Sequence, residues 1–140
     1  MNIGFFFPEQ KITLKERAKL KLFIAELFKK EGFDLGCLTY VFCSDEYLLN
    51  LNREFLQHDY YTDIISFDLS ESKKYKDGEI YISIDRVKDN TSQLGTTIKN
   101  ELHRVIFHGV LHLCGYKDKK PADEKMMRAA EDKYLKLYFK

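Results

Sequence analysis

The segment that most constrains the fold lies between Thr96 and Gly115. Its apolar residues recur at the spacing of one helical face: Val105, Ile106, Val110, Leu111 and Leu113. Thr96 or Thr97 supplies a side-chain cap at the start, and Gly115 supplies the left-handed residue that commonly follows a helix. We therefore expect a helix that ends near residue 114 and buries one face in a core.

Two histidines on this helix predict a metal site. His108 and His112 are four residues apart, so their rings project from the same face. Gly115 lets the chain reverse, and three residues later Asp118 can approach the same ion. The spacing H-x-x-x-H-x-x-G-x-x-D matches the zinc-binding helix and turn of metzincin proteases. We predict one zinc ion on these three side chains, with other divalent metals as alternatives. The competing interpretation is two ordinary packing histidines.

The neighbouring residues limit the chemistry. Metzincins carry a general-base Glu directly after the first histidine, where this chain has Gly109, so a peptidase would lack its main catalyst. His103 is five residues before His108 and therefore falls on a different face. Cys114 is expected to pack in the core as a small apolar side chain.

The rest of the chain predicts strands that alternate with helices. Strands are expected over residues 3–7, 38–43, 64–67 and 79–84, where β-branched and aromatic residues concentrate. Further helices are expected from a Thr13 cap to Gly32, after Ser44, over residues 85–94 and from Pro121 onward. The predicted fold is one α+β domain over residues 1–140. It has a small mixed four-stranded sheet, packed helices and a zincin-like metal helix beside the strand at 64–67.

Composition is consistent with one reduced cytoplasmic domain. The 140 residues are 44% hydrophobic, which is enough for one core. The net charge of +1 gives no global attraction to nucleic acid, so any RNA contact must come from a local patch. Three cysteines without metal-type spacing and an N-terminus without a basic leader favour a cytoplasmic location. No apolar run approaches the roughly 20 residues that span a bilayer, so we expect no membrane partner.

Three segments resemble the YbeY family of metal-dependent endoribonucleases. HGVLHLCGYKDK at 108–119 resembles the family pattern HGxLHLxGYDH, in which three histidines bind the metal. LNREFLQHDYYTDIISF at 51–67 and GEIYIS at 78–83 are similar to two other family segments. The resemblance implies a zinc-dependent, single-strand-specific endoribonuclease that acts in ribosomal RNA maturation, including the 16S 3′ end, and in ribosome quality control. It implies RNA and small-subunit assembly components as partners.

Two positions depart from that family pattern. Asp118 takes the place of the third histidine, and its negative charge should make a metal-bound water a weaker acid. Leu56 stands where the family commonly has an arginine, so the phosphate-contacting or catalytic role of that arginine cannot be transferred. Arg53 and His58 are nearby candidates to supply a donor, although both residue types are common in solvated loops.

Other polar residues are candidates for the substrate cleft. Glu101 and Arg104 fall near the helical face of His108, and Glu101 is expected either to accept from a ligand imidazole or to act as a base through water. The simpler alternative is an i, i+3 salt bridge between them. The family resemblance adds three more cleft candidates, which are otherwise ordinary turn and cap residues: Thr62, Asp63 and Ser66.

Two alternative functions stay open at this point. One is a metal-dependent hydrolase of another substrate such as a peptide, which the ligand spacing favours and Gly109 disfavours. The other is a non-catalytic ribosome-assembly factor with a structural metal, which the changes at Leu56 and Asp118 favour. The lysines at 73–76 and 117–120 are candidates to follow a phosphate backbone, or are simply solvated loop residues.

Overall fold

Strands and helices alternate in the computed structural model, which describes residues 2–9 and 12–140. The strands are β1 (Asn2–Phe6), β2 (Asp34–Cys43), β3 (Ile64–Asp68) and β4 (Tyr75–Ser83). The helices are α1 (Arg17–Lys30), α2 (Asp45–Phe55), α3 (Ile84–Leu94), α4 (Ile98–Leu113) and α5 (Pro121–Tyr138). The strand order is β1-β2-β4-β3, in which β3 alone is antiparallel to its neighbour among these strands. The predicted mixed four-stranded sheet is confirmed.

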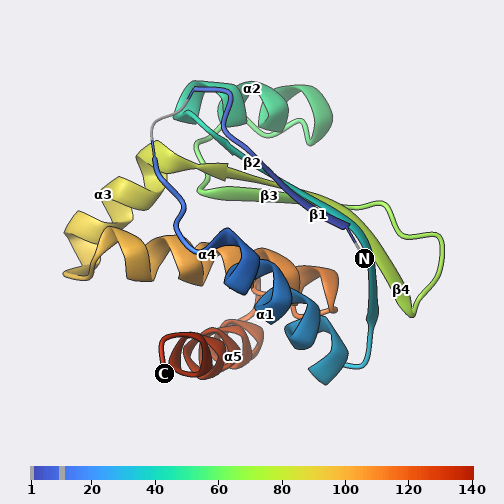
Figure 1. Ribbon diagram of the computed structural model, residues 1–140. Helices are drawn as coiled ribbons and strands as arrows, with labels where there is room; N and C mark the ends of the chain where they lie inside the picture. The colour runs from blue at the N-terminus through green and yellow to red at the C-terminus, as the bar shows by residue number, and fades with distance from the viewer. Residues whose placement is uncertain (1, 10–11) are drawn as a thin grey trace.

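Helices cover both faces of the sheet (Figure 1). Helix α2 lies on one face, and α1, α4 and α5 lie on the other. Side chains alternate along each strand, so Leu38, Tyr40 and Phe42 of β2 enter the main core toward α4, whereas Cys43 packs in a smaller cluster with Leu48 of α2. The predicted α+β architecture is therefore observed, with the larger core between the sheet and α4.

Helix α4 lies directly against the sheet at Gly109, a position that has no room for a side chain. A Cβ atom at Gly109 would come within 2.8 Å of Ile80 Cδ1 and 3.0 Å of Ile64 Cδ1, which is closer than side chains pack. The ends of the helix follow the prediction, since the hydroxyl of Thr97 accepts from the backbone N–H of Asn100 at 3.0 Å. This close approach brings the histidine face of α4 to strand β3.

Four predicted boundaries were clearly wrong. Helix α1 begins at Arg17 rather than at a Thr13 cap, because Glu16 adopts a left-handed backbone conformation (φ 54°) and makes no capping hydrogen bond through its side chain. Strands β2 and β4 begin earlier than predicted, because their pairing continues back to Asp34 and Tyr75, beyond a shift in register between Leu35 and Leu38. Ile84 belongs to α3 rather than to β4, because the hydroxyl of Ser83 caps that helix.

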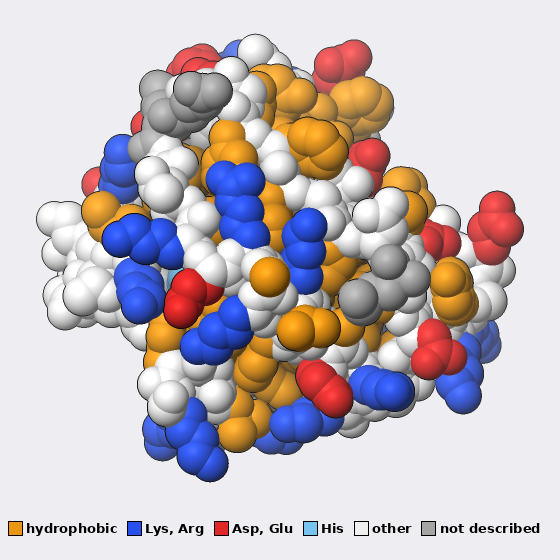
Figure 2. Space-filling view, viewed as in Figure 1, with side chains coloured by type: hydrophobic (Ala, Val, Ile, Leu, Met, Phe, Trp, Pro, Cys, Tyr) orange, Lys and Arg blue, Asp and Glu red, His pale blue; other side chains and the backbone are white. Residues whose placement is uncertain are grey.

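The surface carries charges of both signs. Figure 2 shows Lys and Arg side chains interspersed with Asp, Glu and hydrophobic side chains on the face viewed in Figure 1. This mixture accords with the net charge of +1 and gives that face no field of one sign. Among the described residues, no helix is both long enough and apolar enough to cross a membrane.

Candidate metal centre

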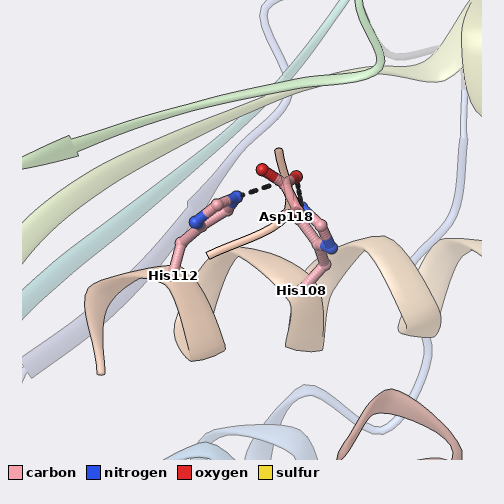
Figure 3. A group of neighbouring side chains, drawn as sticks. All are labelled: His108, His112 and Asp118. Atoms are coloured by element: carbon pink, nitrogen blue, oxygen red, sulfur yellow. Dashed lines mark hydrogen bonds and ion pairs between the residues drawn. The ribbon is translucent and has the colours of Figure 1, made fainter. Parts of the chain in front are cut away.

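Three side chains converge between α4 and the loop that follows it (Figure 3). His108 and His112 rise from α4, and Asp118 returns toward them from the loop. Asp118 Oδ2 lies 3.3 Å from His108 Nε2 and 3.2 Å from His112 Nε2, and one ligand atom from each residue lies within 4.8 Å of the others. A tetrahedral zinc ion with the usual bond lengths separates its ligand atoms by about 3.4 Å. The spacing and the donor types therefore fit one zinc ion.

The loop after α4 fixes both Asp118 and the second imidazole. Gly115 adopts φ 102°, a left-handed conformation that reverses the chain. His112 Nδ1 lies 3.0 Å from the carbonyl oxygen of Tyr116, and a carbonyl only accepts, so Nδ1 carries the proton. The lone pair of His112 Nε2 is consequently directed at the metal position. The phenol of Tyr116 donates to Glu31 at 2.9 Å, which anchors the loop to the end of α1.

Glu131 of α5 holds the first imidazole in the same tautomer. Its Oε2 lies 2.6 Å from His108 Nδ1, and its Oε1 accepts from Arg104 at 2.9 Å and from Arg128 at 3.1 Å. The Glu131 side chain is only 4% exposed. Burial lowers the pKa of His108, but the hydrogen bond and the charge of Glu131 outweigh it, so this pKa is raised above its ordinary value. Outer carboxylates of this kind orient metal-bound histidines in other proteins.

Glu131, rather than Glu101, thus accepts from a candidate ligand imidazole. Glu101 is buried, and its Oε1 makes no hydrogen bond to any residue that the structure describes. The same atom forms an i, i+3 ion pair with Arg104 Nε at 3.8 Å, which is the simpler alternative that the sequence offered. Arg104 also donates to Glu131 and, at 2.9 Å, to Asp132. Burial raises the pKa of Glu101 above its ordinary value. Sequence reasoning missed Glu131, which is distant from His108 along the chain and lies on an amphipathic helix with several other acidic residues.

The metal centre opens into a cavity of about 1130 Å³. Its lining includes most of the candidates that the sequence predicted: His58, Thr62, Asp63, Ser66, Glu101, Arg104 and the three candidate ligands. Leu56, at the position of the family arginine, also lines it. Arg53 instead forms an exposed ion pair with Asp59. The predicted cleft between the metal helix and the strand at 64–67 is therefore observed, with Arg53 outside its lining.

The three candidates in β3 and just before it line the same cavity in different environments. The hydroxyl of Thr62 donates to the carbonyl of Ile64 at 3.3 Å, which is a local turn contact. Burial raises the pKa of Asp63 despite the nearby charge of His108. The hydroxyl of Ser66 is buried without a hydrogen-bond partner among the described residues. An unsatisfied polar atom in a cavity lining indicates a position where water or a bound molecule completes the hydrogen bonding.

The arrangement suits hydrolysis and disfavours the metzincin mechanism. Three protein ligands leave one coordination position open, as in catalytic zinc sites, whereas structural zinc sites are closed by four. The close packing of Gly109 on Ile80 leaves no room for the general-base Glu of the metzincins. Cys114 lies partly buried against the core, and His103 stacks on Tyr138, so both are engaged away from the trio.

Comparisons with known proteins agree with the geometry. The family model described as Endoribonuclease YbeY matches residues 7–138. A Cytophaga hutchinsonii protein named Endoribonuclease YbeY is 54% identical over 97% of this chain and 95% of its own length. A Flavobacterium psychrophilum protein of the same name is 44% identical over 95% of this chain and 94% of its own length. The solution structure of TM1509 from Thermotoga maritima has a TM-score of 0.66 and 29% identity, and covers 98% of this chain and 89% of that one.

Proposed function

The chain belongs to the YbeY endoribonuclease family, and on that premise we propose that it is a zinc-dependent endoribonuclease that cuts single-stranded RNA. We further propose that it acts in ribosomal RNA maturation at the 16S 3′ end and in ribosome quality control, in the cytoplasm and with small-subunit assembly components as partners. The observation that carries the proposal is the trio His108, His112 and Asp118, which is fixed from two sides and faces a large cavity.

Each residue of the trio has a defined part in this chemistry. A bound zinc ion would polarise a phosphoryl oxygen and lower the pKa of a bound water. His108 and His112 present Nε2 lone pairs because Glu131 and the Tyr116 carbonyl hold their Nδ1 protons. Asp118 adds a negative charge where the family has a neutral histidine, so we expect the water to be less acidic than with three histidines.

Three exposed cations in a cavity lining that also carries acidic side chains are candidates to contact a phosphate backbone. Lys119, Lys125 and Arg128 line the cavity that contains the trio, and all three are exposed. Cations in such a position neutralise phosphates and make binding dependent on salt. The other lysine run lies in the segment that begins β4, where Lys76 pairs with Asp68 at 3.6 Å. We therefore assign phosphate contacts to the lysines after the glycine turn and to α5.

Two specific observations bear on the alternative functions. Peptide hydrolysis by the metzincin route is disfavoured because Gly109 packs on the sheet. A non-catalytic assembly factor is favoured by Leu56 and Asp118, which replace two family residues, but three ligands and an open position are unlike a structural zinc site. An assay of cleavage separates these possibilities directly.

The decisive experiment follows the cleavage of a labelled RNA. With zinc present, the wild-type protein should cut a single strand, spare the same strand in a duplex, and lose activity on chelation. His112→Ala should abolish cleavage, whereas His103→Gln, a change on the same helix away from the trio, should retain it. Equal cleavage by wild type and His112→Ala would refute the proposal. Normal 16S 3′-end processing in cells with the His108→Ala, His112→Ala double variant would instead support the non-catalytic role.

A further inference from the structure

Two aromatic rings are exposed together on the loop between α2 and β3. The rings of His58 and Tyr60 are stacked, with centroids 5.1 Å apart and planes 20° from parallel. The Tyr60 hydroxyl and His58 Nδ1 lie 2.9 Å apart, within hydrogen-bond distance. Tyr60 is 56% exposed. The two rings therefore contact each other on the surface and are not part of the core.

The backbone under this pair is held by one buried residue. Asn52 is only 2% exposed, its side chain donates to the carbonyl of Tyr60 at 2.9 Å, and its own carbonyl accepts from the N–H of His58 at 3.1 Å. Gln57 adopts φ 57°, a left-handed conformation that is unusual for a residue other than glycine. Such conformations persist where surrounding contacts fix them. The two rings thus project from a preorganised turn.

Their position relative to the metal centre is specific. His58 and Tyr60 line the same cavity as the trio, together with the cations Lys125 and Arg128 of α5. The next residue, Tyr61, is similarly exposed at 50%, but its hydroxyl donates to Glu46 at 2.7 Å and its ring lies under Arg86. The loop therefore directs one tyrosine to the cavity and the other to α2.

Proteins that bind single-stranded RNA commonly contact its phosphates through cations and its unpaired bases through aromatic rings, and both kinds of side chain line this cavity. We propose that His58 and Tyr60 form a stacking platform for one unpaired nucleobase of the substrate while neighbouring phosphates lie toward Lys125 and Arg128. This inference rests on the proposed RNA cleavage. Every base has a flat face, so the platform discriminates between stacked and unstacked bases rather than between sequences. A paired base within a duplex has both faces covered, which explains a preference for single strands.

The test combines ring removal with base removal. Oligoribonucleotides with one abasic residue at successive positions are cleaved by wild type, Tyr60→Leu and Tyr60→Phe. For wild type, an abasic residue at one fixed position relative to the cut should raise KM about 5- to 160-fold, the range of one base–aromatic stack. Tyr60→Leu should raise KM for intact RNA to a similar degree, leave kcat within about twofold and show no further penalty at that position. Tyr60→Phe retains the ring and should resemble wild type.

Matched variants keep the outcome decisive. Tyr61→Leu, which removes the neighbouring exposed ring, should leave unchanged both KM for intact RNA and the abasic profile, which is the dependence of KM on the position of the abasic residue. His58→Ala removes the other ring and should abolish the same positional penalty, which provides the test if Tyr60→Leu misfolds. If wild type cuts RNA and its abasic profile is identical in Tyr60→Leu and His58→Ala, the platform is refuted while the ribonuclease function stands. If wild type cuts no RNA, both proposals fall.

Discussion

Replacing Glu131 by glutamine should weaken metal binding although residue 131 is not itself a ligand. In the native site both carboxylate oxygens accept hydrogen bonds, Oε2 from His108 and Oε1 from Arg104 and Arg128. A glutamine offers one accepting oxygen and one donating amide. Because an arginine cannot give up its protons, the oxygen should turn to the two arginines and the amide to His108. His108 would then accept at Nδ1 and carry its proton on Nε2, the atom that must bind the ion.

The expected loss follows from this tautomer conflict. Metal binding must either break the new hydrogen bond or oppose two donors. The variant also lacks the hydrogen bond from His108 to a charged carboxylate, and a bond of that kind contributes about 1.5 to 3 kcal/mol. We expect the zinc affinity to fall about 10- to 100-fold, the range seen when the outer partner of a metal-bound histidine is removed. That range corresponds to about 1.4 to 2.8 kcal/mol.

The assay is zinc competition against a chromophoric chelator at fixed pH. Asp132→Asn is the matched control, because Asp132 accepts from the same Arg104 at 2.9 Å but is 51% exposed and does not contact His108. Its zinc affinity should stay within about twofold of wild type. Thermal unfolding of each variant establishes that it is folded. A folded Glu131→Gln variant with wild-type zinc affinity would refute the role of Glu131 in holding the tautomer.

Three further predictions test other parts of the structure. Gly109→Ala should lower the free energy of unfolding by about 1 to 3 kcal/mol in urea titrations, because its Cβ would overlap side chains of β3 and β4; an unchanged midpoint would contradict this packing. Asp118→Ala should weaken zinc binding more than about 100-fold, which exceeds the effect of removing a residue that only hydrogen-bonds a metal ligand. Asp118→His should retain zinc and shift the pH profile of cleavage to lower pH. Burial raises the pKa of Cys43 and Cys114 to about 12, so both thiols stay protonated at pH 8. Iodoacetamide should therefore modify only the exposed Cys37 in the native protein and all three cysteines after denaturation, which mass spectrometry measures as the number of added groups.

The metal helix was predictable because several local features coincide in it. A capping threonine, an apolar face and a glycine stop all lie within one short segment, and they place His108 and His112 on one side. Asp118 could be added because the glycine turn limits where the next few residues can go. The structure brings these three side chains together as the spacing suggests.

Features that depend on distant parts of the chain were not predictable in this way. Glu131 meets His108 only because α5 packs against α4, and no spacing within α5 distinguishes it from its acidic neighbours. The early starts of β2 and β4 have the same origin. Gly36 and Asp77 are typical of turns, yet Asp77 accepts from the N–H of Cys37 at 2.7 Å across the paired strands. Tertiary contacts there outweigh the local preference.

The most direct test of the metal centre is equilibrium zinc binding to the wild type and to the His108→Ala, His112→Ala double variant. Both proteins should unfold cooperatively, because most residues of the main core lie outside the cavity lining and neither histidine belongs to that core. The wild type should bind one zinc ion per chain and the double variant none. A folded double variant that still binds one zinc ion per chain with wild-type affinity would place the ion elsewhere and contradict the site described for this protein.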